Sequence, residues 1–100
     1  MTASEQQLNL KQRAKVFAAL SDPNRLRIVE LLYGHGEMSG SQLADALGIS
    51  LALYSHHSKA LVEAGVIKRR KLGQTRYCSL DRELLGVVVA GFPGNTEEES

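Results

Sequence analysis

The chain has 100 residues, the length of a single domain, and an ordinary globular composition. No apolar run approaches the ~20 residues of a membrane-spanning helix, and the first residues lack a secretory pattern. The net charge of +1 conceals an uneven distribution, because residues 52–77 carry +5 and the remainder −4. We therefore expect a cytoplasmic protein, without a membrane partner, whose cationic segment is either a solvated surface or a face for a polyanion.

Two helices are predicted in the first third of the chain. Residues 5–20 place apolar side chains at roughly helical spacing. A second helix begins where Ser21 or Asp22 can cap the free amides and Pro23 suits the first turn, and the glycines at 34 and 36 end it. The inward stripe of this second helix is expected to comprise Leu26, Val29, Leu32 and Tyr33.

The next two helices are joined by a very short connection. The stretch "SGSQLADALGIS" predicts a third helix, capped by Ser39 or Ser41 and ended by Gly48. Ser50 then caps a fourth helix that runs from Leu51 to Ala64. A three-residue link that contains glycine, between two short helices, is typical of a helix-turn-helix.

The apolar period changes from 3.6 toward 2 after the fourth helix. The segments "VIKRRKL" and "QTRYCSL" flank Gly73 and predict a hairpin with a basic tip. Residues 81–92 predict a last helix, for which Asp81 is a suitable cap.

The order of these elements predicts a mainly α fold with a small β-hairpin, the winged helix-turn-helix. We expect this DNA-binding domain to span residues 1–92, with the helix-turn-helix at about 39–65 and the wing at about 66–80. Residues 93–100 are expected to form a disordered acidic tail.

The fourth helix is predicted to present two different faces. The inward face comprises Tyr54, His57, Ser58, Leu61 and Ala64, and the outward face comprises Ala52, Ser55, His56, Lys59 and Glu63. The small, polar and cationic outward face suits the major groove of duplex DNA, and the wing suits the phosphate backbone. The candidate DNA contacts are Arg25, Ser50, Ala52, Leu53, Ser55, His56, Lys59, Lys68, Arg69, Arg70, Lys71, Gln74 and Arg76.

A single recognition helix reads few bases, so a homodimer formed through the first and last helices is expected. The candidate interface residues are Leu8, Phe17, Leu84, Leu85, Val88 and Phe92. The alternative is that these apolar residues close the core of the monomer.

Other kinds of site find less support in the sequence. His56 and His57 point about 100° apart on a helix and cannot chelate one ion together. A metal site between subunits, built from His35, Glu37 and Met38, is a remaining alternative to a solvated turn. No catalytic constellation and no cofactor site are evident. Cys78 is either a redox-sensitive thiol beside cations or a small buried residue.

Two stretches resemble one family of regulators. "LSDPNRLRIVELL" and "LADALGIS…SHHSKALVEAGVIKRRKLGQTRYCSLD" are similar to the second helix, helix-turn-helix and wing of ArsR/SmtB-type repressors, over residues 13–82. The resemblance implies a homodimeric repressor that binds double-stranded operator DNA. In such families an inducer, often a metal or an oxidant, releases the DNA.

The chain departs from that pattern at the sensor sites. Ser39 and Ser41 stand where many members carry thiolates, and the last helix has no histidine. In the recognition helix, Ser58 stands where a leucine is usual. The resemblance therefore implies a repressor without the usual cysteine metal site and with an unidentified inducer. The alternative function is a winged-helix docking module for another protein, and no enzyme activity is expected.

Overall fold

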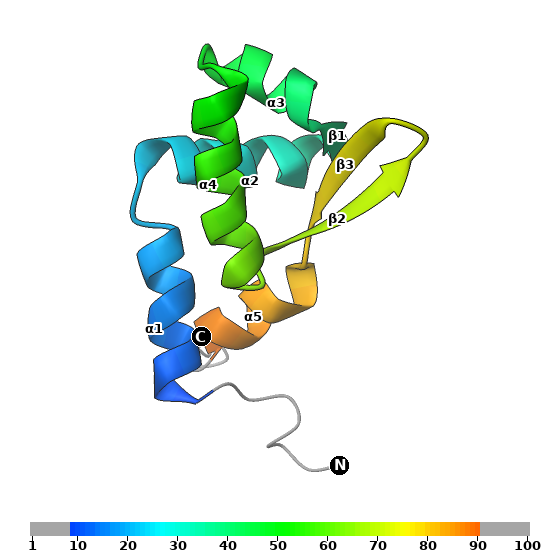
Figure 1. The fold of residues 1–100 in the computed structure, drawn as a ribbon. Helices are drawn as coiled ribbons and strands as arrows, with labels where there is room; N and C mark the ends of the chain where they lie inside the picture. The colour runs from blue at the N-terminus through cyan, green and yellow to red at the C-terminus, as the bar shows by residue number, and fades with distance from the viewer. Residues whose placement is uncertain (1–8, 91–100) are drawn as a thin grey trace.

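The computed structural model of the protein describes residues 9–90. Five helices and three strands are present, and all but one short strand follow the predicted order (Figure 1). They are α1 (Leu10–Ala19), α2 (Pro23–His35), β1 (Glu37–Ser39), α3 (Gly40–Leu47), α4 (Leu51–Glu63), β2 (Ile67–Leu72), β3 (Thr75–Leu80) and α5 (Arg82–Ala90).

Side-chain caps define where the helices begin. Asp22 Oδ1 accepts hydrogen bonds from the amides of Asn24 and Arg25, at 2.8 and 3.3 Å, so α2 starts at Pro23. Ser39 forms a capping box with Gln42 at the start of α3. These caps satisfy amides that lack a partner within the helix, which is why they fix helix starts so sharply. Of the alternatives, the structure selects Asp22 and Ser39.

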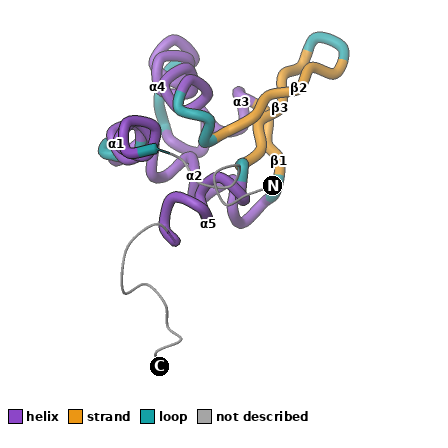
Figure 2. Tube along the Cα trace, turned by 90° about the horizontal axis from the view of Figure 1, so that it is seen from below, coloured by secondary structure: helices purple, strands orange, loops and turns teal. Residues whose placement is uncertain are grey.

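The three strands form one antiparallel sheet in the order β1-β3-β2. The hairpin of β2 and β3 pairs Ile67 with Leu80 and Leu72 with Thr75. The strand β1 was not predicted from the sequence, and it pairs Glu37 with Ser79 on the other edge of β3. Figure 2 shows the hairpin extending away from the helices, as expected for a wing.

The core lies where α2, α3 and α4 meet the base of the sheet. Its fully buried members include Ile28, Leu32, Leu43, Leu61 and Val66.

The predicted inward stripe of α2 is partly wrong. Leu26 and Tyr33 are 48% and 67% exposed, and the buried positions of this helix are Ile28, Leu31 and Leu32. The helix is rotated relative to the predicted stripe because Ile28 and Leu31 pack into the core.

The winged helix-turn-helix fold predicted from the sequence is confirmed. None of the helices within residues 9–90 is long and apolar enough to cross a membrane. Leu8, Phe92 and the acidic segment 93–100 lie outside the described residues.

The first turn of α3 is packed against the ring of Tyr54, which predicts a steric constraint at Gly40. A Cβ atom at Gly40 would lie 3.0 Å from Tyr54 Cε2, whereas one at Gly34 would meet no atom within 4 Å. We expect Gly40→Ala to lower the free energy of unfolding by about 1–2 kcal/mol through overpacking. Gly34→Ala should be neutral or stabilising by up to about 1 kcal/mol. Urea denaturation of both variants measures this difference, and equal stability of the two would contradict it.

Candidate nucleic-acid interface

The turn between α3 and α4 is held by backbone geometry and by one side chain. Gly48 adopts φ 69°, a left-handed conformation that glycine accepts without strain, and its amide donates to the carbonyl of Asp45 at 3.1 Å. Two residues later Ser50 Oγ accepts from the amide of Leu53 at 3.0 Å and starts α4. The orientation of α4 relative to α3 therefore follows from a three-residue segment.

The two faces of α4 lie as the sequence predicts. The outward residues Ala52, Ser55, His56, Lys59 and Glu63 are all exposed, and so is Leu53. On the inward face, Tyr54, His57, Ser58 and Leu61 are buried. The exposed face thus offers hydroxyl, imidazole and ammonium groups on a surface helix.

Buried His57 attaches α4 to the beginning of α2. Arg25 Nε donates to His57 Nδ1 at 3.1 Å. Asn24 Nδ2 lies 3.4 Å from the other ring nitrogen, and Asp22 Oδ1 lies 3.8 Å from Nδ1. Arg25, a predicted DNA contact, therefore also positions the recognition helix from within.

The cations of the wing divide between its two faces. In the β2–β3 register, Lys71 lies opposite Arg76 and Arg69 lies opposite Cys78. The side chains of these four residues lie on the face toward α4. Alternation along the strand places Lys68 and Arg70 on the opposite face.

Arg70 is engaged on that opposite face. Its Nε and Nη2 donate to both carboxylate oxygens of Glu37, at 2.8 and 2.9 Å, and its guanidinium lies 5.1 Å from the ring centroid of Tyr77. Lys68 and Arg70, both predicted DNA contacts, thus lie on the face of the wing that points away from α4.

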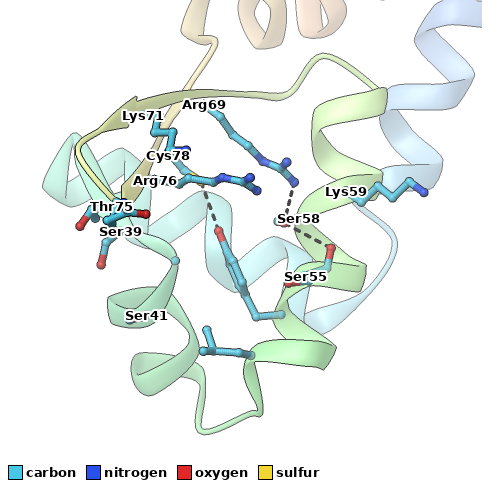
Figure 3. Close-up of a pocket in the computed structure, with 14 residues that line it drawn as sticks. Ser39, Ser41, Ser55, Ser58, Lys59, Arg69, Lys71, Thr75, Arg76 and Cys78 are labelled. Atoms are coloured by element: carbon cyan, nitrogen blue, oxygen red, sulfur yellow. Dashed lines mark hydrogen bonds between the residues drawn. The ribbon is translucent and has the colours of Figure 1, made fainter.

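Two side-chain contacts join the wing to α4. Arg69 Nη2 donates to Ser58 Oγ at 3.0 Å, and Ser58 Oγ donates to the carbonyl of Ser55 at 3.3 Å (Figure 3). The hydroxyl of Tyr54 lies 3.2 Å from Cys78 Sγ. Burial, followed by this contact with Cys78, raises the pKa of the Tyr54 phenol, which stays protonated at neutral pH. The Ser58 hydroxyl is therefore a partner for the wing.

A pocket of about 760 Å³ lies between the wing and the α3–α4 pair. Lys59, Arg69, Lys71 and Arg76 supply its cationic groups. Hydroxyl groups of Ser39, Ser41, Ser55, Ser58 and Thr75 contribute to its walls, and Gln74 lies at the wing tip. The arrangement can bind anions by hydrogen bonds and by charge.

The structure bears on the metal and redox alternatives as well. Among residues 9–90, no group of three or more His, Cys, Asp or Glu side chains is placed to hold a metal ion. In the predicted intersubunit set, Glu37 is paired with Arg70 and His35 Nδ1 lies 2.9 Å from the carbonyl of Leu31. Cys78 is only 2% exposed, which agrees with its alternative as a small buried residue.

Comparison with known proteins identifies similar regulators. The family model described as "Winged helix-turn-helix DNA-binding" matches residues 21–68. The transcriptional repressor SdpR of Bacillus subtilis is 41% identical over 70 residues, which are 70% of this chain and 77% of the repressor. A homologue of the cadmium resistance transcriptional regulatory protein CadC, from Staphylococcus aureus, is 43% identical over 70 residues, which cover 58% of that protein.

Solved structures show the same relationship. An ArsR family transcriptional regulator superposes with a TM-score of 0.74 at 28% identity, covering 84% of this chain and 86% of that one. The homodimeric winged helix-turn-helix DNA-binding domain of a possible ArsR-family regulator from Mycobacterium bovis gives a TM-score of 0.72 at 29% identity, with 81% and 75% covered.

The ion pair on the outer face of the wing predicts a measurable titration. The hydrogen bonds from Arg70 hold the pKa of the Glu37 carboxyl below its ordinary value. The stabilisation from this pair is therefore present above the ordinary carboxyl pKa and is lost as the pH falls through the lowered one. Carbon-13 NMR of the Glu37 carboxyl should show this lowered pKa, and Arg70→Gln should raise it toward the ordinary value. An identical titration in both proteins would exclude the pairing in solution.

Proposed function

The chain belongs to the ArsR/SmtB-type family of winged helix-turn-helix transcriptional repressors, and we propose from this premise that it represses transcription by binding operator DNA as a homodimer. The observation that carries the DNA-binding mode is the common orientation of two surfaces. Ser55 and Lys59, on the exposed face of α4, border the same pocket as Lys71 and Arg76 of the wing. A duplex held against both surfaces places α4 in the major groove and the wing along the backbone.

Each surface has a distinct role in this proposal. Ser55 and His56, exposed on the first turns of α4, contact base edges, and the apolar groups of Ala52 and Leu53 contact thymine methyls. Lys59, Lys71 and Arg76 contact phosphates. Arg69 adds positive charge, and its hydrogen bond to Ser58 connects the wing to α4.

The docking-module alternative does not explain this distribution. A protein-docking wing has no need of unpaired cations on the face toward the recognition helix, while the opposite face pairs Arg70 with Glu37. The repressors to which the chain is related also favour DNA as the partner. Its place of action is accordingly the cytoplasm, with the operator DNA.

The two faces of the wing provide a matched test of DNA binding. Lys71 and Lys68 are exposed lysines on the same strand, and they lie on opposite faces of the hairpin. We expect Lys71→Gln to weaken binding to all duplexes alike, by roughly five- to tenfold at 0.1 M salt, and to reduce the salt slope by about one. Lys68→Gln removes the same charge and should leave the slope unchanged. Fluorescence anisotropy with operator and random duplexes at several salt concentrations measures both effects. If the two variants lose the same slope, the assignment of the inner face to DNA is wrong.

We further propose that α1 and α5 form the dimer interface. Both lie at the end of the molecule away from α3, and they expose Phe17 (40%) and Val89 (52%) (Figure 1). Leu84 and Leu85 are half-buried beside the core and can extend this surface. Val88, predicted at the interface, is only 1% exposed and belongs to the core of the monomer instead.

A charge on α5 should therefore weaken the dimer without disrupting the monomer. Val89→Glu should raise the dimer dissociation constant at least tenfold, about 1.4 kcal/mol, because a carboxylate would be buried in an apolar interface. Leu26→Glu is the control, since Leu26 is similarly exposed but lies on α2. Sedimentation equilibrium distinguishes the two variants. A dimer that tolerates Val89→Glu but not Leu26→Glu places the interface elsewhere.

A further inference from the structure

The pocket between α4 and the wing is lined by charges of one sign. Its lining carries four cationic side chains and, among the described residues, no carboxylate. Glu37 lies on β1, the strand that pairs with β3 of the wing. Its carboxylate forms an ion pair with Arg70 on the opposite face of the hairpin. The inner cations are thus left without a protein counter-ion in this part of the chain.

Two of these cations come from different strands of the wing. Figure 3 shows Arg69 and Arg76 extending from the two strands of the wing into the cavity, toward α4. An anion bound in the pocket is attracted by both cationic side chains. Guanidinium groups bind phosphate oxygens in a bidentate manner, so two of them form a geometry suited to a phosphate group.

The pocket also has the volume of a small-molecule site. Its floor consists of the buried residues Tyr54, Ser58 and Cys78, and their polar atoms are already ordered by the contacts with the wing. Its volume of about 760 Å³ lies within the range of roughly 300–1,000 Å³ that holds small ligands. A phosphodiester of a duplex approaches such a cavity from its rim, whereas a small ligand can enter it.

We propose that this pocket binds a small molecule that carries one or more phosphate groups, with Arg69 and Arg76 as its principal contacts. The bound ligand occupies the space between α4 and the wing and places negative charge where the DNA backbone would approach. The same ligand therefore competes with the operator. Binding of the ligand does not depend on the proposed function, whereas competition with the operator rests on it.

The first experiment measures binding without DNA. Pyrophosphate is titrated into the full chain at constant ionic strength, with isothermal calorimetry and amide chemical shifts as the readouts. We expect a saturable dissociation constant below about 1 mM, with shifts confined to Ser39–Ser41, Ser55–Lys59 and the inner wing. Arg76→Gln should weaken binding at least tenfold.

The control is Arg70→Gln, which removes the same charge from the same hairpin on the opposite face and should weaken binding less than twofold. Equal losses in the two variants would mean diffuse attraction of ions to the wing and would overturn the proposal. Absence of saturable binding at 10-fold higher pyrophosphate than the expected constant would overturn it too.

The second experiment distinguishes a free phosphate ligand from the phosphates of DNA. Pyrophosphate and ADP are added to a complex with labelled duplex, and sodium chloride of equal ionic strength serves as the reference. Release beyond that caused by salt supports competition, and release equal to it overturns the regulatory part. If no duplex binds the protein at low salt, the proposed function fails, while the calorimetric result still decides whether the pocket takes a phosphate.

Discussion

The attachment of α4 to the rest of the protein is the constraint on which the interface depends. The His57 side chain lies on the buried face of α4. Its ring contacts Arg25, Asn24 and Asp22 at the start of α2. A buried hydrogen bond contributes only about 0.5–1.5 kcal/mol net, but an imidazole left without partners would cost about 1–3 kcal/mol. The polar contact therefore specifies one orientation of the helix, whereas Leu61 and the apolar core supply most of the burial energy.

The wing has a comparable arrangement, in which each face of the hairpin has its own partner. Toward α4, Arg69 contacts Ser58 and Cys78 contacts Tyr54, so two side-chain contacts hold the hairpin against the helix. On the other face, Arg70 is neutralised by Glu37. Because Glu37 neutralises one of the two outward cations, more of the unpaired charge of the wing lies on the side toward α4, although the chain as a whole is almost neutral.

Features that depend on neighbouring residues were predictable from the sequence, and features that depend on distant pairing were not. The caps at Ser39 and Ser50 and the end of α3 at Gly48 are local, because a few adjacent atoms decide them. The engagement of Arg70 requires Glu37, 33 residues away, on a strand too short to leave a periodic signal. The charge total of the wing could therefore be read from the sequence, but the choice of free cations could not.

The strand order β1-β3-β2 connects the wing directly to the helix-turn-helix. Because β3 is the central strand, it joins the hairpin to β1. The strand β1 leads directly into the capped first turn of α3. Ser39 pairs with Tyr77 of β3 and also caps α3. One residue therefore joins the sheet that carries the wing to the first helix of the helix-turn-helix.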